Sequence, residues 1–279
     1  MSATTPRPAS GDAATLEEAV ALHRDGDGLV GHVHEGWDVF GVPHGGYLLA
    51  LAGNAVLTGT GAPDVFTITT HYLRKARHAP IRFAVVPVGG SRRFTTATAT
   101  ATQDGEVVLA VQASVGDRSL LEGPTWYRAE PWDPAAARLT PRAGTPEMAA
   151  AAGPSFRTPE VAARAGERLD VTSLGFAGGS PDGSGEIRAV AETVPATQLG
   201  ALLACDITPP ASWNALGARG WVPTVELTAH VRARSGVGPL SVRAWTHHVQ
   251  DGFLEEDALV HDAEGRLLVQ SRQLARWTA

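Results

Sequence analysis

The sequence has little cysteine and no excess of positive charge, and both deficits narrow what the chain can be. Cys205 is the single cysteine among 279 residues, so an intrachain disulfide framework and a cysteine-ligated metal cluster are excluded. The formal net charge is −6, which is opposite in sign to the charge that a nucleic-acid-binding surface needs. We therefore expect neither a structural metal nor a nucleic-acid partner.

Long hydrophobic runs are also missing. No run approaches the roughly 20 residues of a membrane-spanning helix, and residues 1–20 lack the apolar centre of a signal peptide. We therefore expect a soluble, cytoplasmic protein with no membrane partner. Hydrophobic residues make up 43% of the 279 positions, which is enough for one large domain or two small ones with substantial cores.

The stretch 195–210 carries apolar side chains at helical spacing. This spacing predicts a helix over the whole stretch, with one face packed into a core. Asp206 lies on that same face, in the last turn, where the dipole of its own helix does not stabilise a carboxylate. A buried carboxylate is costly unless it is paired or used in chemistry. Asp206 is therefore the first candidate for a functional residue.

A similar pattern occurs earlier, at residues 43–56, and indicates an internal duplication. Both helices are predicted to begin after a proline, and Asn54 precedes Asp206 by 152 positions. The strands that follow repeat as well, since His71 precedes His230 by 159 positions. The offset is 152 between the helices and stays at 159 to 160 along the strands, which predicts two tandem structural repeats, of which one has kept the acid.

Each repeat is expected to contain a strand, a helix and about four long antiparallel strands. This order predicts an α+β fold of hot-dog type, in which a sheet wraps around a long helix, and two copies form a double hot-dog. We place the first repeat at residues 12–117, a linker at 118–184 and the second repeat at 185–279. The linker is expected to hold a single helix, near 159–168, and residues 1–11 a loose tail.

Three short motifs of the second repeat follow one another along the chain: Leu-Ala-Cys-Asp at 203–206, Pro-Thr-Val-Glu-Leu-Thr at 223–228 and Gly-Arg-Leu-Leu-Val-Gln-Ser-Arg-Gln at 265–273. Together with Gly45-Gly46 of the first repeat, they resemble the acyl-CoA thioesterase II family, the double hot-dog thioesterases. The resemblance covers nearly the whole chain outside the tail and the linker. It implies a hydrolase that cleaves acyl-CoA or acyl-carrier thioesters without a cofactor.

In that family an Asp, a hydroxyl residue and a Gln hold the attacking water, and these positions match Asp206, Thr224 and Gln273. The resemblance thus implies that Asp206 is the base, while Thr224 and Gln273 orient the water. It also implies a homodimer or a larger homo-oligomer, because hot-dog sheets usually join edge to edge. The corresponding positions of the first repeat hold Asn54, Asp64 or Val65, and Ala113. One active site per chain is therefore expected.

The first repeat is still expected to contribute to substrate binding through Gly45, Gly46 and Tyr47. Backbone N–H groups at the start of a helix are free donors, and glycine permits close approach of a carbonyl oxygen. We expect the amides of Gly46 and Tyr47 to form the oxyanion site, opposite Asp206. An ordinary helix start with flexible glycines is the structural alternative.

Two other functions stay open at this point. His44 would be the base of a hot-dog hydratase or dehydratase that acts on enoyl or 3-hydroxyacyl thioesters. A non-catalytic acyl-thioester-binding protein would keep the fold without turnover. Cys205 is expected to be a buried packing residue and not a nucleophile.

Overall fold

The computed structural model describes residues 15–127, 132–153, 157–178, 183–218 and 220–278. The expected tail at 1–11 lies outside the described residues. The helices are α1 (Leu16–Ala19), α2 (Gly45–Thr60), α3 (Pro146–Ala152), α4 (Glu160–Ala165), α5 (Gln198–Ala204) and α6 (Ser212–Leu216). None of these helices is long and apolar enough to span a membrane.

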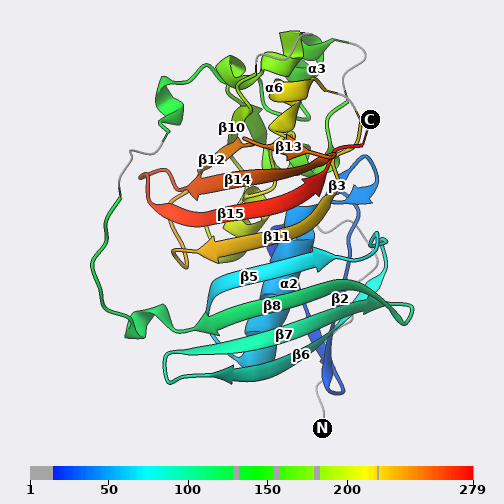
Figure 1. The fold of residues 1–279 in the computed structure, drawn as a ribbon, viewed down its shortest axis with the longest axis vertical. Coiled ribbons are helices and arrows are strands. Elements are labelled where there is room, and N and C mark those ends of the chain that lie inside the picture. The colour runs from blue at the N-terminus through cyan, green and yellow to red at the C-terminus, as the bar shows by residue number, and fades with distance from the viewer. Residues whose placement is uncertain (1–14, 128–131, 154–156, 179–182, 219, 279) are drawn as a thin grey trace.

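Most strands join one antiparallel sheet, in which each repeat forms one half (Figure 1). The first half contains β1 (His23–Asp25), β2 (Gly28–His32), β6 (Pro80–Gly90), β7 (Phe94–Gln103), β8 (Glu106–Gly116) and β5 (Asp64–Tyr72), in that spatial order. The second half continues with β11 (Thr224–Val231), β15 (Leu267–Arg276), β14 (Phe253–His261), β12 (Leu240–Trp245), β10 (Glu186–Ala191) and β9 (Glu167–Leu169). The short strand β13 (Val249–Gln250) pairs with β14, and β3 (Asp38–Val39) forms a separate hairpin with β4 (Val42–Pro43).

The two repeats meet where β5 pairs with β11. Thr69 and Thr228, which are 159 positions apart, stand directly opposite each other there, and their hydroxyl oxygens are 2.8 Å apart. The axis that relates the repeats therefore passes between these two threonines. This pairing confirms the double hot-dog that the constant offset predicts.

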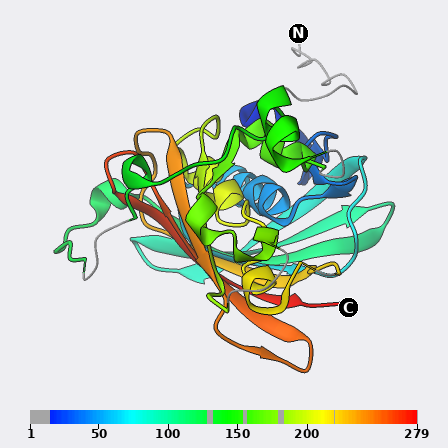
Figure 2. The same ribbon diagram turned by 90° about the horizontal axis from the view of Figure 1, so that it is seen from above.

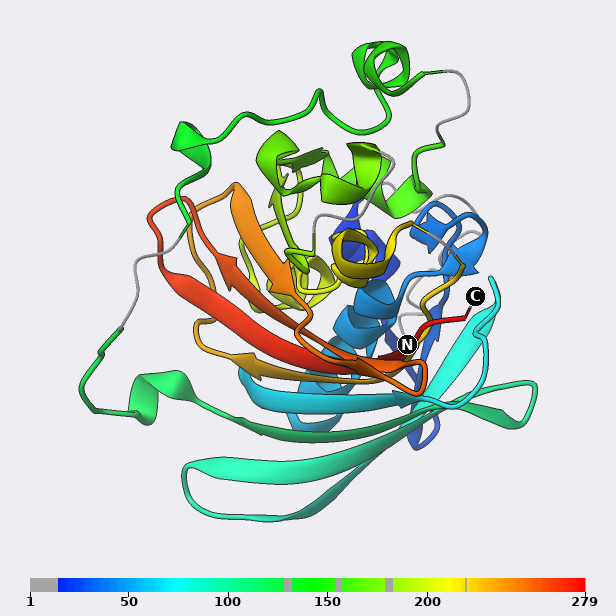
Figure 3. The same cartoon turned by 45° about the horizontal axis from the view of Figure 1, so that its top comes forward.

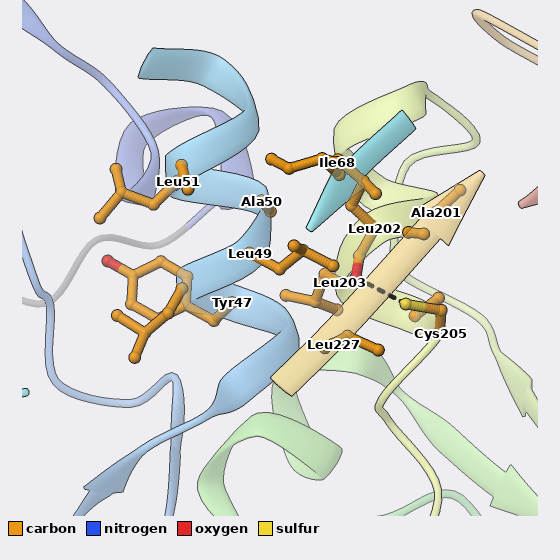
Figure 4. Close-up of a cluster of buried hydrophobic side chains, with 14 of the residues drawn as sticks. Tyr47, Leu49, Ala50, Leu51, Ile68, Ala201, Leu202, Leu203, Cys205 and Leu227 are labelled. Atoms are coloured by element: carbon orange, nitrogen blue, oxygen red, sulfur yellow. Dashed lines mark hydrogen bonds between the residues drawn. The ribbon is translucent and has the colours of Figure 1, made fainter. Parts of the chain in front are cut away.

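The sheet curves around the central helix α2, and helices α3 and α4 of the segment that connects the repeats lie on the far side of α2 (Figures 2 and 3). Helix α5 packs antiparallel to α2, because Gly46 approaches Leu203 while Gly53 approaches Leu199 and Leu202. The side chains of both helices join one buried cluster (Figure 4). The start of α2 therefore lies beside the end of α5.

Two of the expected elements differ from the structure. The helix predicted over 195–210 is wrong in extent, because α5 ends at Ala204 and α6 begins only at Ser212. Pro209 and Pro210 keep a helix from running through to Ser212, since a residue before proline is driven out of the helical conformation, although α5 ends before that point.

The connecting segment also holds more than the one expected helix. Helix α4 confirms the predicted helix, but α3 precedes it, with a Thr145 cap and Pro146 in its first turn. The segment also supplies β9, which pairs with β10 at the edge of the sheet. The boundaries of the two repeats stay a prediction.

Candidate active site

Asp206 lies just after α5, where the N-terminus of α2 meets it. Its Oδ2 accepts a hydrogen bond of 2.8 Å from the Gly46 N–H, and its side chain is 12% exposed. The first turn of α2 carries partial positive charge, so it stabilises this carboxylate as an anion. The expectation from the sequence concerned the dipole of α5 alone, and the helix end that stabilises Asp206 belongs to the other repeat.

Gln273 connects Asp206 to two further polar side chains. Its Nε2 donates to Asp206 Oδ1 at 3.2 Å and to Glu256 Oε1 at 3.0 Å, and its Oε1 accepts from the Thr224 hydroxyl at 2.6 Å. The Asp206 carboxylate fixes the orientation of the amide, since the opposite orientation would turn the amide oxygen towards it. The structure thus brings together the three residues selected from the sequence and adds Glu256.

A β-bulge turns Thr224 towards this group. Strand β15 lies between β11 and β14, and the register of β11 against β15 shifts between Thr224 and Glu226. Without the extra residue, the alternation of the strand would turn Thr224 to the outer face of the sheet. The bulge therefore places the Thr224 hydroxyl beside Gln273, on the face that packs against the helices.

His44 caps α2 and contacts Asp206 from the first repeat. Its Nδ1 accepts from the Tyr47 N–H at 3.3 Å, and its Nε2 lies 2.8 Å from the Asp206 carbonyl oxygen and 3.4 Å from Oδ2. An Nδ1 that accepts carries no proton, so the neutral ring has its proton on Nε2 and donates it to Asp206. Both ring nitrogens are engaged, and His44 holds the start of α2 against Asp206.

The residues expected to bind substrate at the start of α2 have different surroundings. The ring of Tyr47 is fully buried on the side of α2 away from Leu203 (Figure 4), and its hydroxyl accepts from the His34 N–H at 3.1 Å. The amides of Tyr47 and Gly46 donate to His44 and to the Asp206 carboxylate. No described residue accepts from the Gly45 N–H. Gly45 therefore offers the free donor at this helix end.

The first repeat holds apolar side chains at the corresponding sheet positions. Strand β5 has the same bulge as β11, directly after Val65, so Val65 and not Asp64 is the counterpart of the bulge threonine. The counterparts of Thr224, Gln273 and Glu256 are, in that order, Val65, Ala113 and Ala97. Asn54 lies inside α2 and donates to the Val20 carbonyl at 2.7 Å. The polar group therefore exists in the second repeat alone.

Glu256 is the residue that the sequence analysis missed. Its side chain is 6% exposed, and burial raises the pKa of its carboxyl to about 8. Its Oε2 accepts from the Ala211 N–H at 2.6 Å. A signal was present in the sequence, because Glu256 shares the inward face of its strand with Leu254, Ala258 and Val260. A glutamate within such an apolar set has to be paired or used.

Other chemistry has little support in the described residues. No three His, Cys, Asp or Glu side chains there are placed to hold a metal ion. Cys205 is buried, its Sγ donates to the Leu202 carbonyl at 3.2 Å (Figure 4), and burial raises the pKa of its thiol to about 12. A thiol is a poor nucleophile at neutral pH when its pKa is this high. The described residues therefore support neither a metal centre nor a cysteine nucleophile.

Known proteins resemble this chain over most of its length. An uncharacterized protein of Mycobacterium tuberculosis is 27% identical over 263 residues, which cover 88% of this chain and 89% of that protein. A Thermobifida fusca protein described as a thioesterase II superposes with a TM-score of 0.78 at 23% identity, over 96% of this chain and 100% of that chain. An acyl-CoA thioesterase II of Mycobacterium marinum superposes with a TM-score of 0.69 at 14% identity, over 94% and 97% of the two chains. At these identities, the structural likeness shows a shared fold.

Sequence families give the more specific result. Residues 33–116 match the acyl-CoA thioesterase N-terminal domain, and residues 125–276 match the acyl-CoA thioesterase C-terminal domain. The second match alone spans more than half of the chain, and the two follow each other in the order that the two repeats require. This chain belongs to the acyl-CoA thioesterase family.

Proposed function

We propose that this enzyme hydrolyses acyl-CoA thioesters with a water molecule that Asp206 activates and Thr224 orients, without a covalent intermediate. The observation that carries the proposal is the Gln273 amide, which lies within hydrogen-bonding distance of both side chains. Family membership supplies the reaction class, and the geometry supports the choice of residues.

The hydrogen bonds leave two acceptors facing the proposed water. The Thr224 hydroxyl gives its proton to Gln273, so its oxygen keeps lone pairs that can accept. The Asp206 carboxylate accepts from Gly46 and Gln273 and still has acceptor capacity. A water between them would donate one hydrogen bond to each and direct a lone pair at the thioester carbon. In this arrangement Gln273 orients Thr224 and does not itself bind the water.

The reaction then needs one base and one oxyanion donor. Asp206 takes a proton from the water as the water oxygen bonds to the carbonyl carbon, and the carbonyl oxygen becomes an oxyanion. We assign the Gly45 N–H as its donor, because this amide is free and lies at the positive end of α2. The C–S bond then breaks, and the sulfur of coenzyme A leaves with the proton that Asp206 held. One water is consumed, and one carboxylic acid and one thiol are released.

The hydratase or dehydratase alternative requires His44 to act as a base. Both of its ring nitrogens are hydrogen-bonded within the protein, so the geometry favours hydrolysis. Turnover separates an enzyme from a non-catalytic acyl-thioester-binding protein.

We also propose a homodimer or larger homo-oligomer, which light scattering would measure.

The test is thiol release from a panel of short, medium, long and aromatic acyl-CoAs. Asp206→Asn should lower kcat by about 10²–10⁴-fold, the usual contribution of a general base. The matched control is Asp257→Asn, because Asp257 lies on the opposite face of β14 and pairs with Arg272 at 2.6 Å. This control should keep wild-type kcat. Undiminished turnover by Asp206→Asn, in a folded protein, would refute the assignment.

A further inference from the structure

We propose that Glu256 is a positioning residue of this active site, which holds both the Gln273 amide and the chain segment that carries Asp206. The inference rests on the proposed function, because it gives Glu256 a part in the same hydrolysis. Glu256 has no assigned role in the mechanism above, although it is the second carboxylate of the site.

Glu256 acts first on the orientation of Gln273. Strand β14 places it directly opposite Gln273 on β15, and its Oε1 takes one of the two amide protons at 3.0 Å. The other amide proton points to Asp206. With both protons committed, the amide oxygen must face Thr224, and the threonine must donate to it. Glu256 therefore helps to orient the Thr224 hydroxyl so that its oxygen accepts a hydrogen bond from the water.

The second oxygen of Glu256 fixes the backbone near Asp206. It accepts from the Ala211 N–H at 2.6 Å, at the end of the segment 205–211 that joins α5 to α6. Asp206 stands near the start of that segment, where His44 holds its carbonyl oxygen. Glu256 is thus the attachment at the far end of the same segment. Loss of this attachment would let the Asp206 carboxylate move relative to α2.

The first repeat supports a role in chemistry over a role in folding. Its counterpart of Glu256 is Ala97, which stands opposite Ala113 in the same register. The sheet of this fold therefore forms without a carboxylate at that position. The glutamate is present in the repeat that also holds Asp206, Thr224 and Gln273.

The variant that tests this is Glu256→Gln. Both oxygens of Glu256 accept from N–H groups, so the new side chain must turn its own NH₂ towards one of those donors. At pH 9, where most of the Glu256 carboxyl is ionised, we expect kcat to fall about 10-fold or more while KM stays within about twofold, because the groups that orient the water move and the rest of the substrate site does not. Glu256→Asp, whose side chain is one methylene shorter, should have a kcat between those of wild type and Glu256→Gln. It replaces Glu256→Gln in the test if that variant does not fold.

The matched control is Glu255→Gln on the same strand. Glu255 also accepts from two N–H groups, those of His247 and His248 at 2.8 and 3.1 Å, but on the outer face. This control should lose a comparable amount of thermal stability and keep its kcat. A double-mutant cycle with Gln273→Ala gives the second readout. Since one of the two routes by which Glu256 acts runs through Gln273, Glu256→Gln should lower kcat by a smaller factor in the Gln273→Ala background than in wild type.

Each outcome decides a different statement. A kcat for Glu256→Gln equal to that of Glu255→Gln would overturn the inference and leave the proposed function intact. Fully multiplicative effects of Glu256→Gln and Gln273→Ala would also overturn it, because the two residues would then act independently. Wild-type kcat in Gln273→Ala would contradict the proposed role of Gln273 in hydrolysis and overturn the part of this inference that runs through Gln273.

Discussion

The start of α2 and the end of α5 approach so closely that one methyl group should disturb the active site. A Cβ on Gly46 would lie 2.4 Å from the Leu203 carbonyl oxygen and 3.0 Å from Asp206 Cβ. Ordinary contacts begin at 3.4 Å. The nearer obstacle is backbone, so no change of rotamer relieves it. Gly46→Ala therefore requires the two helix ends to separate by about 1 Å.

The two effects of that alanine on stability oppose each other. Alanine favours a helix over glycine by about 1 kcal/mol, whereas overpacking costs about 1–3 kcal/mol. The free energy of unfolding should therefore fall by at most about 2 kcal/mol. Activity should suffer more, because the Gly46 N–H moves away from the Asp206 carboxylate. A displacement of about 1 Å can lower kcat by about 100-fold.

The assay is kcat for the preferred acyl-CoA, together with the urea midpoint of each variant. Gly53→Ala is the matched control, since Gly53 lies on the same helix and faces α5. A Cβ there would meet the end of the flexible Leu202 side chain at 2.9 Å, away from Asp206. It should keep kcat. Equal kcat values for the two alanine variants would refute the claim that this contact positions the base.

Two further predictions concern buried carboxyl groups. Glu167 is buried, no described residue bonds to its Oε1, and burial raises its pKa from 4.5 to about 8. As the pH rises from 4.5 to 8, the unfolded state loses the Glu167 proton and the folded state keeps it. The free energy of unfolding therefore falls by about 1.4 kcal/mol per pH unit over this range. Glu167→Gln should match wild type near pH 4.5 and be more stable at pH 8, and parallel stability curves would contradict this. Burial opposes ionisation of Asp64, but the hydrogen bonds from Arg234, the Arg118 N–H and the charges of both arginines together outweigh it and lower the pKa of Asp64. Arg234→Gln should therefore lower Tm by several degrees at pH 7 and by less as the pH falls through that lowered pKa. Arg232→Gln, whose partner Gln270 is uncharged, should change Tm little.

Sequence reasoning predicted two kinds of feature. They are patterns within one segment and the constant offset between corresponding strands of the two repeats. The duplication is confirmed because the strand offset of 159 positions reappears as the direct pairing of Thr69 with Thr228. Asp206 stood out because a carboxylate on an apolar helix face is costly. Its contact with His44 was not predictable in this way, since it depends on how the helices of two repeats meet. The bulge at Thr224 likewise depends on a neighbouring strand.

The two repeats differ most in their helices, and this difference creates the site. Helix α2 runs from Gly45–Thr60 without interruption, so Asn54 stays within the helix. Helix α5 stops at Ala204, so Asp206 leaves the helix and reaches the start of α2. At the opposite end of the two packed helices, where α5 begins, a capping threonine stands in place of a carboxylate. There Thr197 caps α5 by accepting from the Gly200 N–H at 3.2 Å.

This asymmetry predicts that sheet residues alone cannot rebuild a second site. Val65→Thr with Ala113→Gln would place the hydroxyl and the amide at the counterpart positions of β5 and β8. The helix end beside them would still lack a carboxylate, because Asn54 remains inside α2 and is held by the Val20 carbonyl. The two substitutions, made in an Asp206→Asn background, should therefore not restore thiol release. Turnover above that of Asp206→Asn alone would mean that a hydroxyl and an amide suffice to activate water, and that the base assigned to Asp206 is dispensable.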